Sequence, residues 1–106
     1  MKVAFLRSAE SDLKDLRSYI VRNFGKETWL ESYAKVKESV AMMADHPQIG
    51  RIPPELERLN ITPYRQVVSG LNRIIYELRG DTAYIHIACD TRRDLKSLLM
   101  KRIVSP

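Results

Sequence analysis

The sequence predicts an α+β domain in which an antiparallel helical hairpin packs on a small antiparallel sheet. Residues 8–46 hold two amphipathic segments with the 3.6-residue period of helices. Residues 64–87 instead alternate apolar and polar side chains, which is the two-residue period of strands. Strands grouped after helices are typical of α+β proteins, whose helices pack against one face of the sheet.

The first half of the chain predicts one short strand and two helices. Residues 2–6, "KVAFL", form the strand, with Val3 and Phe5 on one side. Ser8 is the expected cap of the first helix, and Gly25 is expected to end it. The second helix follows over residues 26–46. The predicted apolar faces consist of Ala9, Leu13, Leu16 and Ile20 in the first helix, and Trp29, Tyr33, Val36, Val40 and Met43 in the second.

The second half begins with a connection, residues 45–63, that contains four of the five prolines. A structureless connection of this length is uncommon, so we expect it to have packing of its own. Pro54 is expected to start one short helical turn. A strand over residues 64–70, a β-hairpin over residues 73–87 and a final basic amphipathic helix, "RRDLKSLLMKR", complete one domain of residues 1–106.

Gly80-Asp81 is the predicted turn of the hairpin, because glycine tolerates the positive φ that tight primed turns require. The resulting register pairs Glu77 with Tyr84, Tyr76 with Ile85, Ile75 with His86, Ile74 with Ile87 and Arg73 with Ala88. The core face then consists of Ile74, Tyr76, Leu78, Ala83, Ile85 and Ile87, and Cys89 shares their parity. The other face, which we expect to remain open, carries Arg73, Ile75, Glu77, Arg79, Tyr84 and His86, joined by Arg65 from the preceding strand.

Composition and charge narrow the class of protein. A chain of 106 residues with 44% apolar and 29% charged residues is ordinary for a folded soluble protein. Its single cysteine excludes an internal disulfide and favours a reducing compartment. Only four consecutive apolar residues precede Arg7, too few for a signal peptide, and no later run reaches transmembrane length. We therefore expect a cytoplasmic protein with no membrane partner.

The net charge of +5 is concentrated in the second half of the chain. Residues 51–106 hold 10 Lys+Arg against 6 Asp+Glu, whereas residues 1–50 hold 8 against 7. This imbalance favours an anionic partner, either nucleic acid or an acidic polypeptide. The final basic segment, with five cations and one acid, could contact phosphates or an acidic tail, or could simply expose its charges to solvent.

The chemistry of the expected open face allows two interpretations. Arg73, Glu77 and His86 could supply the cation, acid and base that RNA cleavage requires. Polar residues also populate an exposed sheet face by default, and the predicted register offsets Glu77 from His86 along the sheet. Two histidines and one cysteine form no recognisable metal-ligand spacing, and no phosphate-binding glycine loop is present, so we expect neither a metal nor a cofactor.

Five motifs occur together in a characteristic order: "SAESDLKDLRSYI", "FGKETW", "HPQIGR", "YRQVVSGLNRIIYEL" and "YIHIACDTRRDL". In this order and spacing the chain resembles the RelE/ParE superfamily of bacterial toxins over nearly its whole length. The resemblance implies a compact fold with a helical hairpin on a small antiparallel sheet. It also implies an acidic cognate antitoxin that wraps and neutralises the toxin, with a homodimer or a toxin–antitoxin hetero-oligomer as the assembly.

The resemblance leaves two activities open. RelE-like members cut messenger RNA at the ribosome, whereas ParE-like members poison DNA gyrase and so block replication. "DLKDLRSYI" and "HPQIGR" look more like the ParE branch, and the C-terminal "KRIVSP" lacks the His-Tyr pair of nuclease members. Asp90 also stands where many relatives carry a histidine. The leading hypothesis is a gyrase inhibitor with no catalytic residues; the alternative is a ribosome-dependent endoribonuclease using Arg73, Glu77 and His86.

The partner contacts expected from the sequence are all cationic. Two lie on the sheet and five on the last helix: Arg65, Arg73, Arg92, Arg93, Lys96, Lys101 and Arg102.

Overall fold

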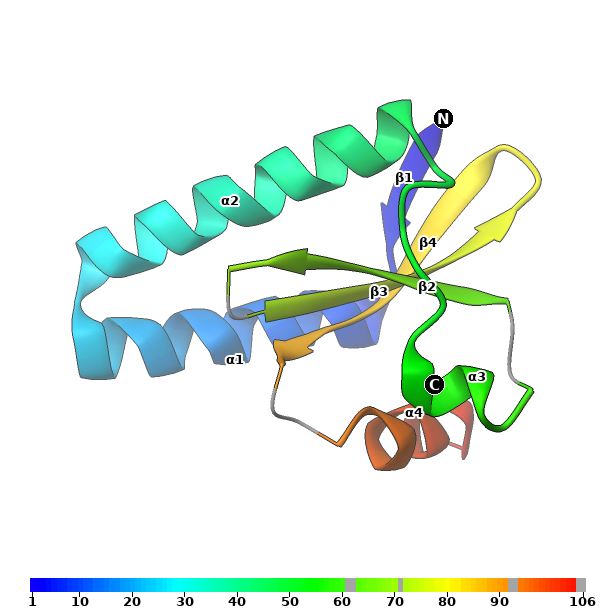
Figure 1. Ribbon diagram of the computed structural model, residues 1–106. Coiled ribbons are helices and arrows are strands. Elements are labelled where there is room, and N and C mark those ends of the chain that lie inside the picture. Colours follow the sequence, from blue (N-terminus) through cyan, green and yellow to red (C-terminus); the bar gives the residue numbers. More distant parts are fainter. Residues whose placement is uncertain (61–62, 71, 92–93, 105–106) are drawn as a thin grey trace.

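The computed structural model describes residues 1–60, 63–70, 72–91 and 94–104, and it confirms the predicted α+β architecture (Figure 1). In chain order the elements are β1 (Lys2–Phe5), α1 (Arg7–Phe24), α2 (Lys26–Asp45), α3 (Pro54–Glu57), β2 (Tyr64–Ser69), β3 (Asn72–Arg79), β4 (Thr82–Asp90) and α4 (Leu95–Val104). The strands form one sheet in the order β1-β4-β3-β2. It is a mixed sheet, because β1 runs parallel to β4 while the two other pairs are antiparallel.

The helical hairpin starts one residue after β1 ends. Leu6 is the residue that precedes α1, and its backbone is held extended by a hydrogen bond from its N–H to the carbonyl of Ile85, 3.0 Å away. The helix therefore begins at Arg7, and Ser8 lies inside the first turn. The prediction that Ser8 caps this helix is wrong. Gly25 ends α1 as predicted, with a φ of 95° that suits glycine.

The first hydrophobic core lies between the hairpin and the sheet, as the helical periodicity predicts. Ala9, Val36 and Met43 of the helices pack against side chains of the two long strands. The strand residues of this core are Ile74, Tyr76, Ala83 and Ile85. Four of the six residues predicted to face the helices are therefore fully buried there, and Leu78 packs at the edge.

The opposite face of the sheet, which the sequence leaves open, is covered by α3 and α4. Leu56 of α3 and Leu95 and Leu99 of α4 pack on Ile75 and Ile87 to make a second core. The two helices lie together at the bottom of Figure 1, away from α2. The expectation of an open cationic sheet face is therefore wrong, because the leucine face of α4 finds its apolar partner on this side of the sheet.

A β-bulge in the hairpin accounts for that second core. Near the turn the register is as predicted, with Glu77 opposite Tyr84 and Tyr76 opposite Ile85. Ile75 then pairs with Ile87, so His86 is an extra residue on β4. An extra residue reverses the parity beyond it. Ile87 and Cys89 consequently belong to the second core, which corrects the face assigned to both of them.

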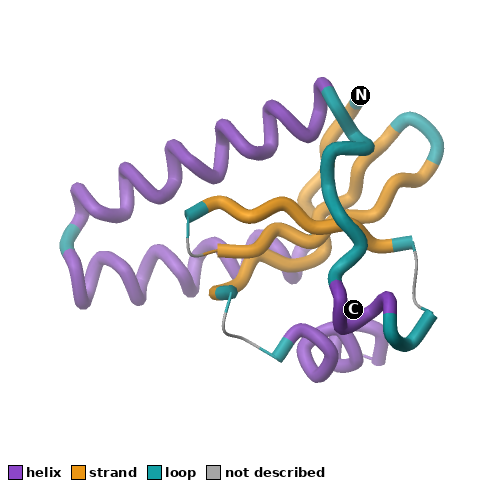
Figure 2. The backbone as a smooth tube through the Cα atoms, in the orientation of Figure 1, coloured by secondary structure: helices purple, strands orange, loops and turns teal. Residues whose placement is uncertain are grey.

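The proline-containing connection packs against the sheet, as its length predicts. Figure 2 traces it from the end of α2, past the strands, to α3. The Tyr76 hydroxyl accepts a hydrogen bond from the Gly50 N–H (3.0 Å) and donates one to the Pro47 carbonyl (2.8 Å). Arg51 also exchanges two backbone hydrogen bonds with Gln66 of β2. The connection is thus held to the edge of the sheet by one buried tyrosine and one backbone bridge.

Candidate functional site

Glu77 and His86 are brought into contact by the bulge. The regular register would place His86 opposite Ile75, but as the extra residue it reaches Glu77, whose Oε1 lies 3.0 Å from its Nε2. Tyr64 packs edge-on against the imidazole ring, with ring centroids 5.1 Å apart. The acid and base that the sequence separates along the sheet therefore form a partly buried pair.

The Glu77 carboxylate is shared between two donors. Arg79 lies 2.9 Å from the same oxygen that His86 contacts. Burial alone would raise the pKa of Glu77, but the hydrogen bonds from Arg79 and His86 together outweigh burial and lower it. A cleft of about 340 Å³ opens beside this pair, with Arg7 and Arg102 also among its lining residues. Chemically, the Glu77 carboxylate orients the His86 imidazole, and arginine side chains line the cleft beside the pair.

Arg73 is not part of this pair. Its guanidinium makes a bidentate ion pair with Glu55 of α3, at 2.7 and 3.0 Å, and its Nε donates to the Gln66 side chain at 2.9 Å. Arg73 is only 6% exposed, and the hydrogen bond with Glu55 raises its pKa further above the usual arginine value. The expectation that Arg73 presents its charge to a partner is wrong, because α3 covers and neutralises it.

Arg65 faces the helical side of the sheet. It pairs with Tyr76 on β3, so its side chain lies on the face opposite to Arg73. Its guanidinium donates to the Gly50 carbonyl at 2.8 Å and to the Gln48 side chain at 2.9 Å. The prediction that Arg65 joins Arg73 on one face is wrong, since adjacent strands in register place the two side chains on opposite sides.

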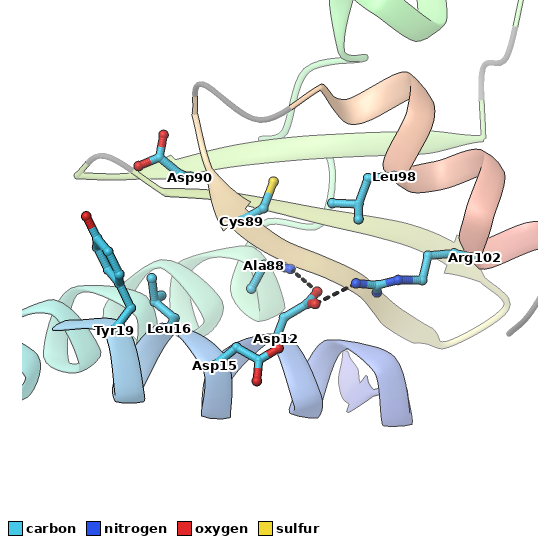
Figure 3. Close-up of a pocket in the computed structure, with 9 residues that line it drawn as sticks. All are labelled: Asp12, Asp15, Leu16, Tyr19, Ala88, Cys89, Asp90, Leu98 and Arg102. Carbon is cyan, nitrogen blue, oxygen red and sulfur yellow. Dashed lines mark hydrogen bonds and ion pairs between the residues drawn. The ribbon is translucent and has the colours of Figure 1, made fainter. Parts of the chain in front are cut away.

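Arg102 joins three distant parts of the chain. It pairs with Asp12 of α1, and it donates a hydrogen bond to the His86 carbonyl, 2.9 Å away. Asp12 also accepts a hydrogen bond from the Ala88 backbone N–H, 3.0 Å away (Figure 3). Both residues line a cleft of about 560 Å³. Arg102 therefore fastens α4 to α1 and β4, and it is not a freely exposed contact residue.

Two cations of α4 remain exposed. Lys96 and Lys101 point away from the second core, as the leucine spacing of this helix predicts. Arg92 and Arg93, the remaining two cations in the predicted contact set, lie outside the described residues.

Within the residues that the structure describes, no group of three or more His, Cys, Asp or Glu side chains could hold a metal ion. The same ranges contain no helix both long and apolar enough to cross a bilayer.

Two carboxylates that organise this region carry no signal in the sequence. Asp12 lies within the polar stretch of an amphipathic helix, and Glu55 follows the prolines of the connection. Each is separated from its arginine by a long stretch of chain, 90 residues for Asp12 and 18 for Glu55. Local periodicity identifies such residues as solvent-facing, so their roles emerge only when the fold brings the arginines to them.

Because the carboxylates of these ion pairs have lowered pKa values, we predict that the folded state is less stable in acid. The hydrogen bond from Arg73 lowers the pKa of Glu55, and the pKa of Glu77 is lowered as described above. A carboxyl whose pKa is lower in the folded state stabilises the fold above its unfolded pKa and loses that effect as the pH falls through the folded value. We expect the free energy of unfolding, measured in urea, to decrease steadily below about pH 4. The Glu55→Gln/Glu77→Gln variant should show a shallower decrease, and an identical slope would contradict this origin.

The comparisons with known proteins agree with the geometry. The sequence profile described as "ParE toxin of type II toxin-antitoxin system, parDE" matches residues 3–95. A solved structure described as "Chromosomal ParDE TA system from P. aeruginosa" superposes with a TM-score of 0.70 at 17% sequence identity. The match covers 85% of this chain and 95% of the other, and at this identity it shows a shared fold. Among proteins of curated function, none matches significantly.

Proposed function

This chain belongs to the ParE toxin family of type II toxin–antitoxin systems, and we propose that it inhibits DNA gyrase in the cytoplasm and so stops replication. The observation that carries the proposal is the family match over residues 3–95. Binding without chemistry is further supported by Arg73, because the cation that the catalytic interpretation requires is neutralised by Glu55 and shielded from solvent.

Induced expression tests this function against its alternative. After induction of the toxin we expect DNA synthesis, followed by thymidine incorporation, to stop before protein synthesis, followed by methionine incorporation. A ribosome-dependent endoribonuclease would produce the reverse order. If protein synthesis falls first, gyrase inhibition is not the activity of this chain.

The endoribonuclease remains the second candidate because of one observation, the 3.0 Å contact between Glu77 and His86 beside an arginine-lined cleft. His86→Ala removes the base of such a mechanism. We expect this variant to arrest growth as the wild type does, provided that its urea unfolding transition shows a folded protein. Loss of toxicity in a folded His86→Ala protein would instead support catalysis.

The neutralising antitoxin is expected to bind at the free edge of β1. The N–H of Lys2 bonds to the carbonyl of Asp81 in the hairpin turn and that of Leu6 to the carbonyl of Ile85 on β4, so the alternating amides of Val3 and Phe5 point away from the sheet. Beside this edge lies a mainly apolar groove of about 740 Å³ between β1, α1 and α2. An extended segment could add a strand here and bury apolar side chains in the groove. Lys14 and Lys37 at the groove suit acidic residues of such a segment.

The affinity for an acidic antitoxin should depend on salt. Raising the salt concentration from about 50 to 500 mM shortens the Debye length and so screens the exposed charges more strongly. This change should weaken the complex on the order of tenfold, or about 1.4 kcal/mol. Calorimetry on the purified proteins measures this change. The Lys14→Glu/Lys37→Glu variant should bind more weakly and respond less to salt. A complex indifferent to ionic strength would show that charge pairing contributes little.

A further inference from the structure

Exposed apolar side chains gather at the tip of the helical hairpin. Four of the eleven large hydrophobic residues that are exposed within the described part of the chain lie between residues 19 and 30. Tyr19 is 54% exposed and Phe24 62%, and their rings meet edge to face with centroids 6.1 Å apart. The tip projects beyond the end of the sheet in Figure 1. A clustered apolar surface of this kind marks a binding surface more often than scattered single residues do.

A cavity lies directly behind these two rings. It has a volume of about 390 Å³ and lies between α1, the first half of α2 and the connection of β2 to β3. Leu16 and Ile20 contribute apolar surface to it, and Ser69 lines its far side. Ser69 is only 5% exposed, and its hydroxyl has no hydrogen-bond partner among the residues that the structure describes. A buried hydroxyl without a partner costs stability unless a bound group supplies the missing hydrogen bond.

The cavity adjoins the cleft of Figure 3. Leu16, Tyr19 and Asp90 line both hollows, which lie next to each other along α1 and are together named the α1 groove here. Four carboxylates and two cations are among the residues that line it. Asp15 and Glu31 make no ion pair with any described residue. The groove is therefore acidic on a chain whose net charge is +5.

We propose that the α1 groove binds a segment of the target protein that combines an apolar anchor with lysine or arginine residues. The anchor packs against Tyr19 and Phe24, a polar group of the segment bonds to the Ser69 hydroxyl, and the cations pair with Asp15 and Glu31. This chemistry repels an acidic antitoxin and the phosphates of nucleic acid. The inference rests on the proposed function, since it takes gyrase as the target.

Supercoiling by purified gyrase, titrated with toxin, measures the contribution of the groove. Phe24→Ser and Asp15→Lys should each raise the toxin concentration for half-inhibition by about tenfold or more. Met42→Ser is the matched control: this side chain is 47% exposed near the other end of α2 and does not line the groove, so its half-inhibition should be unchanged. The antitoxin should bind Phe24→Ser and the control as it binds the wild type, and should bind Asp15→Lys at least as tightly, which excludes misfolding.

Ser69→Ala gives a second and more specific readout. Removing an unpartnered buried hydroxyl should leave the urea unfolding midpoint equal or higher, whereas inhibition should weaken by roughly threefold because the complex loses a hydrogen bond. If Ser69 had only a structural role, Ser69→Ala would not weaken inhibition while leaving the unfolding midpoint equal or higher. Equal inhibition by wild type, Phe24→Ser and Asp15→Lys overturns the proposal.

The two proposals fail in different ways. If the wild-type toxin does not inhibit gyrase, the proposed function fails, and the groove is then judged by growth arrest on induction. Arrest that persists in Phe24→Ser and Asp15→Lys would overturn the groove as a target site. Arrest that is lost in both variants but kept in Met42→Ser would support the groove with a different target.

Discussion

Replacing Tyr76 with alanine is expected to lower the free energy of unfolding by about 3–5 kcal/mol. The side chain is fully buried in the first core, and its hydroxyl also holds the proline-containing connection through Gly50 and Pro47. Tyr76→Phe keeps the ring and should cost about 1–3 kcal/mol, because it leaves the buried Gly50 N–H without its partner. Urea unfolding of the purified variants measures both values.

Tyr84 is the matched control for this prediction. It is a tyrosine on the neighbouring strand, and only partly buried. Tyr84→Ala should therefore cost clearly less than Tyr76→Ala. Equal costs for the two variants would show that the connection and the first core do not depend on Tyr76 as the geometry indicates.

Replacing Glu55 with leucine is expected to cost about 3–5 kcal/mol, since it leaves the Arg73 guanidinium buried without a counter-charge. The reverse substitution should be milder. The Glu55 side chain is 35% exposed, so in Arg73→Met water can hydrate the carboxylate, and we expect a loss of about 1–2 kcal/mol. Urea unfolding at neutral pH measures the asymmetry between the two variants.

The double variant Glu55→Leu/Arg73→Met completes the cycle. It removes both charges, so its stability should exceed that of Glu55→Leu alone. A double variant that loses the sum of the two single effects would show that the residues act independently. The ion pair would then not be what holds α3 on the sheet.

The helices and strands of this fold can largely be predicted from the sequence, whereas the second core on the other face of the sheet cannot. Helical spacing identified the apolar faces of the hairpin, and Gly80-Asp81 identified the turn of the strands. The bulge at His86 has no local signal, because "YIHIAC" alternates as a regular strand would. One signal did exist: the leucine face of the last helix and Ile75 on the supposedly polar face each required an apolar partner.

The candidate site was predicted less well than the fold, for a physical reason. Sequence reports the charge of an arginine but not the carboxylate or carbonyl that it meets after folding. Arg65, Arg73 and Arg102 each fasten a distant segment to the sheet or to α1. Three of the five described cations of the predicted contact set are thus structural, and the exposed lysines of α4 are the other two.

The most direct test of the central proposal is the supercoiling of relaxed plasmid by purified gyrase in the presence of the purified, folded toxin. We expect supercoiling to fall as the toxin concentration rises, and to recover when the cognate antitoxin is added. Full supercoiling at a large molar excess of toxin would contradict gyrase inhibition as the function of this chain.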